Sequence, residues 1–423
     1  MRVAGPSGGT PPAADGRAGY RRGVIRKSPF HKRTNALNET GLWSHWSGHL
    51  AAHRYQLSDK FEYFTVRNAA GVFDSSPLYK YRIHGRDAER FLSGILARDI
   101  RKCAPGNAQY TAWCDDRGFV VEDGVILRPA ADEFLLTAAE PNLAYFEDLS
   151  SRRHEVAIDE VSDEYGILAV QGPRSRVLLA ALVPGVATIP FFGVTTGSIA
   201  GSPVTVSRTG YSGDLGFEIW VRSNDALKVW DALWGSMAGF GVLPFGLDAL
   251  DLLRIEAGLL LLDVDFANSR YGWTDEDRSS LIELGWGWMV RDLATDDRPF
   301  IGRRAIEREL ADKTSRWRLT GLIVDWADYD RIYGEAGLIP PKDHTPILGE
   351  MFLYDDDSVQ VGYTTSYMYS PMLQRHIALA RVRPALAAPG STVRLEIDVN
   401  HRYEYVTART ARLPLYNPSR KTA

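Results

Sequence analysis

The chain has 423 residues, of which 45% are hydrophobic and 24% charged, and its formal net charge is −4. A chain of this length exceeds what one compact core usually holds, so we expect two or three domains. The charge balance gives no reason to expect a nucleic-acid partner, which needs a concentrated basic face. No apolar run approaches the roughly 20 residues of a membrane-spanning helix, so no membrane partner is expected.

The cysteines and the N-terminal residues indicate the cellular compartment of the protein. The two cysteines, Cys103 and Cys114, form no Cys-x-x-Cys pair, so the sequence offers neither a disulfide framework nor a thiolate metal cluster. A reducing cytoplasm fits this usage best. Residues 1–27 are rich in Gly, Pro and Arg and lack the apolar centre of a secretion signal. We predict a disordered tail there, with solvated arginines that include Arg26.

The first half of the chain alternates apolar and polar residues in short runs, which is typical of strands. Strands are predicted over residues 79–83, 109–114, 120–128, 134–138 and 166–171, and short helices over 85–92, 143–150 and 176–182. Residues 115–118 (Asp-Asp-Arg-Gly) have the turn chemistry of a hairpin between two of these strands.

The second half changes character near Trp317. Before it, residues 204–221 predict a strand pair around a glycine-rich turn, followed by a helix capped by Ser223 or Asn224 and a second helix over 247–262. After it, short strands and turns continue to the end. The change predicts a separate all-β C-terminal domain.

Three histidines, His45, His49 and His53, recur every four residues. That spacing places them along one face of a predicted helix, where three imidazoles can bind a metal. Trp43 and Trp46 lie beside them and favour the simpler interpretation, an amphipathic surface helix that packs its aromatic side chains. No metal site is predicted. The glycines at 210, 213 and 216 lack the spacing of a dinucleotide-binding loop, and no nucleophile elbow or zinc motif occurs.

Carboxylates inside apolar strands are a further chemical signal, which indicates either a buried ion pair or a site. Glu122 and Asp123 interrupt the run 120–127, and because adjacent strand residues face opposite sides, one of them points inward. Glu218 has the same setting within 215–221. A buried charge needs a partner or a function, and Arg254 and Glu256 on the later helix are candidate structural partners.

Several short segments carry one ordered pattern along nearly the whole chain. They are 70–75 (AGVFDS), 118–123 (GFVVED), 169–173 (AVQGP), 207–213 (SRTGYSG), 216–218 (GFE), 254–258 (RIEAG), 361–366 (VGYTTS), 370–373 (SPML) and 377–380 (IALA). In this order and spacing they resemble the glycine-cleavage T-protein (aminomethyltransferase) family.

The resemblance implies an α+β fold in which three domains form a ring around a central folate site. Two interleaved α+β domains are expected over residues 28–316, and a C-terminal β-barrel over 317–423. It also implies a tetrahydrofolate-dependent one-carbon transferase.

The family's site residues map onto matching positions of this chain. Asp123 is the expected catalytic aspartate near the reactive pterin nitrogen, and Tyr110 lies near it. Glu218 is expected to anchor the pterin, because a carboxylate accepts two N–H groups of a pyrimidine edge in a planar geometry. Asp123 is also expected to bind the cofactor by holding the folate nitrogens, and to screen positive charge that develops during transfer. Tyr211 and Arg254 complete the expected cofactor-binding set.

The chain departs from the family pattern where the one-carbon donor is expected. The departures are Leu250 for an arginine, residues 261–265 (Leu-Leu-Asp-Val-Asp) for Leu-Tyr-Gly-x-Glu, residues 74–78 (Asp-Ser-Ser-Pro-Leu) for Asp-x-Ser-His-Met, and Ala138 for an asparagine. They resemble the divergent branch of tetrahydrofolate-dependent demethylases, which act on methyl ethers, methylated amines or sulfonium compounds. Tyr110 or Tyr211 is then the candidate acid for the leaving group.

Further interpretations stay open at this stage. There are three of them. The first is an aminomethyltransferase that gives methylenetetrahydrofolate, the second is a non-catalytic folate-binding protein, and the third is a detached folate domain that works with a partner oxidase. The second lacks support, because the cysteine motif of such relatives is absent after the helix. The aromatic residues Trp43, Trp46 and Tyr271 fit either an aromatic-substrate pocket or ordinary core packing.

Overall fold

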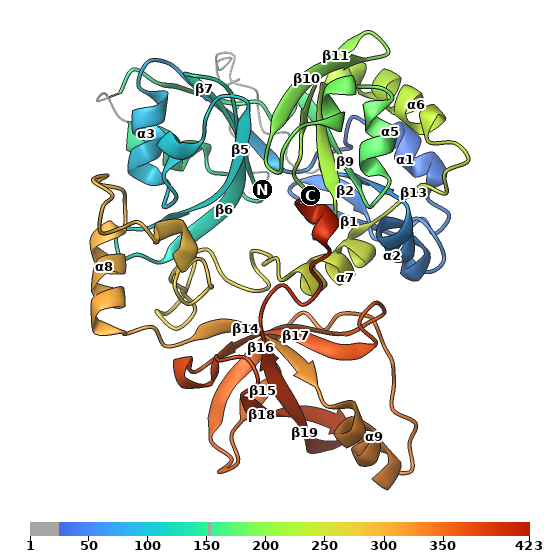
Figure 1. Ribbon diagram of the computed structural model, residues 1–423, viewed down its shortest axis with the longest axis vertical. Coiled ribbons are helices and arrows are strands. Elements are labelled where there is room, and N and C mark those ends of the chain that lie inside the picture. The colour runs from blue at the N-terminus through green and yellow to red at the C-terminus, as the bar shows by residue number, and fades with distance from the viewer. Residues whose placement is uncertain (1–24, 151–153) are drawn as a thin grey trace, which may run out of the picture.

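The computed structural model describes residues 25–150 and 154–423, arranged as three lobes (Figure 1). The predicted tail, residues 1–27, lies outside the described residues apart from its last three. Of these three residues, Arg26 contacts the folded chain, because its Nη1 forms an ion pair with Asp163 Oδ1 at 2.7 Å.

The first lobe is built on a six-stranded sheet with the order β10-β11-β12-β9-β3-β13. The strands are β3 (Gly71–Asp74), β9 (Tyr165–Gln171), β10 (Val194–Ile199), β11 (Ser202–Ser207), β12 (Gly216–Arg222) and β13 (Leu243–Pro244). Its helices are α1 (His31–Leu37), α2 (Asp59–Asn68), α5 (Ser175–Ala180), α6 (Ala226–Ser236) and α7 (Leu247–Ala257).

The second lobe lies between β3 and β9 in the chain. Its five-stranded sheet has the order β5-β6-β7-β4-β8. The strands are β4 (Tyr79–His84), β5 (Asn107–Cys114), β6 (Val120–Ala130), β7 (Glu133–Ala138) and β8 (Ala157–Glu160), with the helices α3 (Ala88–Ile95), α4 (Leu143–Ser150) and α8 (Arg303–Asp312) nearby. Because β3 and β9 pair with each other, the two α+β lobes are interleaved in sequence.

The third lobe is a closed six-stranded barrel with the order β14-β17-β16-β15-β18-β19. The strands are β14 (Arg318–Val324), β15 (Phe352–Tyr354), β16 (Gln360–Ser370), β17 (Arg375–Val382), β18 (Thr392–Val399) and β19 (Arg402–Ala411). The predicted α+β fold with a C-terminal barrel is therefore confirmed.

Four local predictions were wrong, and each error has a physical reason. The first concerns the histidines, which lie on a hairpin of β1 (Trp43–Trp46) and β2 (His49–Ala52), not on a helix. Ser47 and Gly48 have φ of 46° and 78°, the two left-handed residues that a tight hairpin turn requires. The four-residue spacing of the histidines was a coincidence with helical periodicity.

The other three concern helices. The C-terminal region is not all β, because Asp325 caps α9 (Trp326–Glu335) by accepting from the amides of Ala327 and Asp328. The predicted helix 247–262 ends at Ala257, because Gly258 adopts φ 67°.

The predicted cap of α6 is also wrong. Ser223 Oγ donates to the Asp163 carbonyl instead, and Ser223 to Asp225 form a 3-10 turn before the helix.

A shared apolar core lies where the three lobes meet. It combines buried residues of α2, β3, β5, α7, the segment 281–300 and the barrel strands β16 and β17. The other large clusters belong to single lobes. The junction is therefore a core in its own right, and it fixes the lobes relative to one another.

Buried polar contacts at the junction centre on Glu256 of α7. Its Oε1 accepts from Tyr63 Oη of α2 at 2.6 Å and from Ser370 Oγ of β16 at 2.5 Å. Its Oε2 accepts from Arg67 Nη2 at 2.6 Å. Arg67 also donates to the Ser212 carbonyl at 3.0 Å, so one carboxylate joins α2, α7, the barrel and the glycine-rich loop.

We predict that Glu256→Ala lowers the free energy of unfolding by about 3 kcal/mol, because it removes the closer of the two carboxylates that neutralise buried Arg67 and leaves only Asp214, at 3.5 Å. Urea unfolding followed by tryptophan fluorescence measures the change. Glu164→Ala is the matched control, since Glu164 pairs with Arg222 in solvent and such pairs contribute about 0–1 kcal/mol. Equal losses in the two variants would contradict the assignment of Glu256 as the junction's central acceptor.

Candidate functional site

Asp123 and Tyr110 are brought together by the pairing of β5 and β6. Ala112 lies opposite Asp123 and Tyr110 opposite Val125, so Tyr110 and Asp123 are diagonal neighbours on one face of the sheet. Tyr110 Oη donates a hydrogen bond of 2.7 Å to Asp123 Oδ2. The two residues predicted as catalytic therefore form one contact, on the face that turns to the junction.

The electrostatics of this pair define its protonation. Burial raises the pKa of Asp123 to about 6, and the Tyr110 hydrogen bond opposes that rise. Burial, reinforced by the charge of Asp123, raises the pKa of Tyr110 well above its ordinary value. Above pH 6 the pair is thus a carboxylate held by a phenol that keeps its proton.

Glu122, the neighbour of Asp123, faces the opposite side of β6. Its carboxylate accepts hydrogen bonds from the amides of Ala139 and Glu140 and from Asn142 Nδ2, and the side chain is fully buried. Burial raises the pKa of Glu122 to about 8. All of these partners belong to the second lobe, so Glu122 is bound within that lobe, whereas Asp123 lies on the other face of the strand.

Glu218 lies on β12, opposite Ser207 of β11. Its Oε2 accepts a hydrogen bond from Thr209 Oγ1, which Ser207 Oγ contacts at 2.6 Å. Burial raises the pKa of Glu218, and no cation pairs with it among the described residues. Its Oε1 accepts no hydrogen bond from the part of the chain that the structure describes, so it is free for a ligand N–H.

Tyr211 and Arg254 lie close together beside the same junction. Burial raises the pKa of Tyr211 well above its ordinary value; the charge of Arg254 opposes the rise, and the charges of Asp265 and Asp123 add to it. Its hydroxyl donates to the Leu260 carbonyl. The proximity of Tyr211 to the charges of Arg254 and Asp123 connects α7 to the Asp123 pair.

Arg254 is fully buried and only partly satisfied. Its Nε donates to Asp251 at 2.9 Å and its Nη1 to Asp265 at 2.6 Å, whereas Nη2 has no partner among the described residues. The predicted pairing of Arg254 or Glu256 with the strand carboxylates was wrong, because Arg254 is held by these two aspartates and Glu256 by Arg67. Nη2 is therefore a buried donor without a partner among the described residues, and it has no accessible surface in this arrangement of the side chains.

Sequence reasoning missed three contributors to this region. Asp265 joins α7 to the barrel, because its other oxygen accepts from Thr365 and Ser366 of β16. Trp286 packs edge-on against Tyr110, with ring centroids 5.8 Å apart, and Trp288 lies nearly parallel to it at 6.4 Å. The Trp-Gly-Trp run at 286–288 was the available signal for the last two.

The other predicted aromatic residues divide between packing and exposure. Trp43 packs on His31 and Trp46 on Phe73, at centroid distances of 4.7 and 5.9 Å. Tyr271 is 57% exposed. Only Trp46 contacts the junction core.

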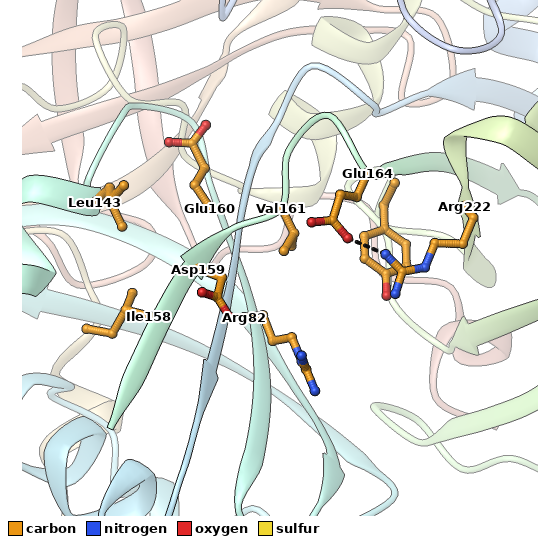
Figure 2. Close-up of a pocket in the computed structure, with 9 residues that line it drawn as sticks. Arg82, Leu143, Ile158, Asp159, Glu160, Val161, Glu164 and Arg222 are labelled. Carbon is orange, nitrogen blue, oxygen red and sulfur yellow. Dashed lines mark hydrogen bonds and ion pairs between the residues drawn. The ribbon is translucent and has the colours of Figure 1, made fainter. Parts of the chain in front are cut away.

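A cavity of about 420 Å³ lies elsewhere, along the edge of β8 and the ends of β9 and β12. Figure 2 shows Arg82, Glu164 and Arg222 around it, with Glu164 and Arg222 joined by an ion pair. None of the predicted site residues lines this cavity. Glu164 and Arg222 pair with each other, and Arg82 pairs with Glu133 and Asp159 with His84. The junction, which holds the predicted site residues, is therefore the better candidate site.

Two negative findings bear on function. In residues 25–150 and 154–423, no group of three His, Cys, Asp or Glu side chains is arranged to hold a metal ion. Among the same residues, no helix is both long and apolar enough to cross a membrane.

Two family models and several named relatives match most of the chain. The family model described as GCVT N-terminal domain matches residues 32–291, and that described as glycine cleavage T-protein C-terminal barrel domain matches residues 336–417. A protein named aminomethyltransferase from Halothermothrix orenii is 30% identical over 84% of this chain and 90% of its own. One from a Parafrankia strain is 32% identical over 91% and 96%.

A solved structure extends the comparison to the fold. The crystal structure of the glycine cleavage system aminomethyltransferase T from Bartonella henselae has a TM-score of 0.77 and 23% identity, covering 93% of this chain and 99% of its own. The family matches and this fold define the predicted class, a one-carbon transferase that uses tetrahydrofolate. The chain belongs to the glycine cleavage T-protein family.

We predict that Tyr110→Phe raises the pKa of Asp123 further above 6, because the hydrogen bond that opposes the effect of burial is lost. The carboxyl group then takes up its proton at a higher pH than in the unmodified protein. Titration of the aspartate carboxyl carbons by NMR measures the shift. Tyr145→Phe is the control, since Tyr145 Oη donates to the Cys114 carbonyl instead. An unchanged or lowered pKa of Asp123 would contradict the prediction.

Proposed function

We propose that this protein demethylates a small methylated donor and passes the methyl group to tetrahydrofolate, giving 5-methyltetrahydrofolate. The observation that carries the proposal is the arrangement on α7. Leu250 packs against the junction core where the family pattern has an arginine, and the next aspartate, Asp251, is already bound to Arg254. The part of the site where the one-carbon donor is expected therefore has an apolar side chain and a carboxylate that is already paired. Such a surface suits a small methylated compound better than a long carrier-bound arm.

The residues present fit tetrahydrofolate. The pterin edge offers N–H donors, and Asp123 and Glu218 are carboxylates that have no cation pairing with them among the described residues. Arg254, fully buried beside Tyr211, adds a positive charge next to this site, although its unpartnered Nη2 has no accessible surface. When bound, tetrahydrofolate supplies the nitrogen that takes up the one-carbon unit.

The protein's own contribution is positioning and electrostatics. Tyr110 fixes the orientation of the Asp123 carboxylate, and the junction core keeps both strands in place. A carboxylate held in a buried site stabilises positive charge that develops near it without having to reorganise. Holding donor and acceptor in line supplies a further part of the acceleration.

The tyrosines favour a donor whose leaving group needs no proton. The pKa values of Tyr110 and Tyr211 are both raised well above the ordinary value, and both hydroxyls already donate to protein oxygens. Neither is suited to act as a general acid near neutral pH. Among the three donor classes, methylated ammonium and sulfonium compounds leave as neutral products, so they fit this site better than methyl ethers.

Aminomethyl transfer, with methylenetetrahydrofolate as product, is the second candidate. The observation in its favour is that the relatives named aminomethyltransferase are about 30% identical over most of the chain. The two candidates share the folate site and differ in the oxidation level of the transferred carbon. A non-catalytic folate-binding protein, and dependence on a partner oxidase, are further outcomes that the same experiment separates.

The test is to supply tetrahydrofolate with donors that carry ¹³C in the transferred carbon and to identify the product by NMR. We expect 5-methyltetrahydrofolate from a methylated ammonium or sulfonium donor, without any added oxidase. Methylenetetrahydrofolate formed from an aminomethyl donor would instead establish the second candidate. Binding without turnover of any donor would contradict both transfer reactions.

We predict that Glu218→Gln weakens tetrahydrofolate binding by about 10- to 100-fold, because a charge-assisted hydrogen bond is replaced by a neutral one. Isothermal titration calorimetry measures the dissociation constant. Glu164→Gln is the matched control and is expected to bind as the unmodified protein does. A Glu218→Gln protein with unchanged affinity would remove this carboxylate from the folate site.

We predict that Asp123→Asn keeps folate affinity within a few-fold but slows transfer by about 100-fold, since the charge that stabilises the transition state is lost. Single-turnover rates at saturating folate measure the effect. A variant that loses affinity and rate in the same proportion would assign Asp123 to binding alone.

A further inference from the structure

The segment that follows the last barrel strand returns to the first lobe. Residues 413–421, which we call the strap, come after β19 and pass α7 in Figure 1, where they are drawn in red. Leu413 and Leu415 pack against the shared core, and the Tyr416 amide donates to the Glu256 carbonyl at 2.8 Å. The strap therefore connects the barrel to the first lobe along the junction.

Arg420 joins the strap to the glycine-rich loop, which we define as residues 209–216. Its Nε donates to Asp214 Oδ1 at 2.7 Å and its Nη2 to Asp214 Oδ2 at 2.8 Å, so the contact is bidentate. The Asp214 side chain is fully buried, whereas that of Arg420 is 36% exposed. Arg67 lies farther from Asp214, at 3.5 Å. Arg420 is therefore the closer counter-ion of a buried carboxylate.

The strap also contacts the residue directly before the loop. Arg208 is 3% exposed, and its Nη2 donates to the Lys421 carbonyl at 3.1 Å. Inside the loop, Gly213 has φ 71° and packs so closely on α7 that an added Cβ would lie 2.3 Å from the Ala257 Cβ. Glycine loses more conformational freedom on folding than any other residue, so a loop with three glycines depends on contacts that hold it.

The loop carries side chains of the candidate folate site. Thr209, its first residue, donates to Glu218 Oε2, and Tyr211 donates to the Leu260 carbonyl. The contact with Thr209 sets the orientation of the Glu218 carboxylate. Within the described part of the chain, Arg420 forms no hydrogen bond or ion pair with Glu218 itself. Any effect of Arg420 on that carboxylate must pass through the loop.

We propose that Arg420 is a positioning residue for folate binding. By fixing Asp214, it holds the glycine-rich loop in the conformation in which Thr209 orients Glu218 toward the pterin. Two parallel hydrogen bonds fix the plane of the guanidinium as well as its distance, which a single contact does not. The inference rests on the proposed function for the role of Glu218. Asp123 lies on β6 of the second lobe, outside this series of contacts.

The test is a double-mutant cycle in which isothermal titration calorimetry measures the dissociation constant of tetrahydrofolate. Arg420→Met is expected to weaken binding about tenfold in the unmodified protein and less than about twofold in a Glu218→Gln protein, because its effect passes through that carboxylate. Arg420→Lys keeps the charge without the bidentate geometry, so an intermediate loss is expected. Arg375→Met is the control, since Arg375 lies on the barrel and donates to the adjacent Gln374 carbonyl.

Two further measurements separate positioning from a general loss of structure. Amide hydrogen exchange of Arg420→Met is expected to speed up in residues 209–216, whereas β16 and β17 keep their protection. The single-turnover rate at saturating folate is expected to stay within about twofold of that of the unmodified protein, because affinity and not transition-state stabilisation is lost.

Three outcomes would overturn the proposal. Equal weakening by Arg420→Met in both backgrounds, or faster exchange in all three lobes, would show that Arg420 acts other than through Glu218. Unchanged affinity of Arg420→Met would also overturn it, while a weakened Glu218→Gln protein would leave the proposed function standing. A Glu218→Gln protein that binds as tightly as the unmodified one would instead remove the proposed role of Glu218, and this inference with it.

Discussion

The carboxylate of Glu256 is the contact on which the arrangement of the three lobes depends. It accepts from a tyrosine and an arginine of α2 and from a serine of the barrel, and the side chain is fully buried. Removing a buried charge from water is costly unless the partners around it are complete. The geometry that completes them also fixes α7, and with it the positions of Asp251 and Arg254 beside the candidate site.

The second lobe illustrates how one strand separates structure from chemistry. Glu122 and Asp123 are neighbours in sequence, yet the pleat of β6 sends them to opposite faces. The first accepts hydrogen bonds from donors of its own lobe, whereas the second accepts one from Tyr110 at the junction. A shift of register by one residue would exchange the two, so the pairing of β5 with β6 determines which carboxylate is available to a ligand.

The parts of the fold that sequence predicted well are those with local signals. Alternation located β4, and short apolar runs bounded by turn residues located β5 to β7 and β9; in the turn at 115–118, Gly118 has φ 82°. The histidine hairpin failed because a two-residue turn interrupted a spacing that suits a helix equally well. Asp123, Glu218 and Tyr110 were candidates because carboxylates stand out in apolar strands and because family segments surround them, and the structure brings Tyr110 and Asp123 into contact.

The residues that sequence missed depend on contacts between distant segments. Arg98 and Trp288 are 190 positions apart, and nothing in either local pattern indicates that they meet. Asp265 is placed between α7 and β16 by three lobes that must first assemble. Such neighbours are properties of the assembled junction, and a pattern of local spacing carries no information about them.

The interleaving of the two sheets has a consequence for how the chain is synthesised. β3 leaves the ribosome long before its partner β9, and the whole second lobe is made between them. Until β9 emerges, β3 exposes an unpaired edge. The second lobe can complete its own sheet in that interval and brings the ends at 74 and 165 together. If the second lobe folds early, the loop between β3 and β9 becomes effectively shorter, and the first sheet loses less entropy when it closes. The second lobe then acts during synthesis as a template on which the first lobe folds.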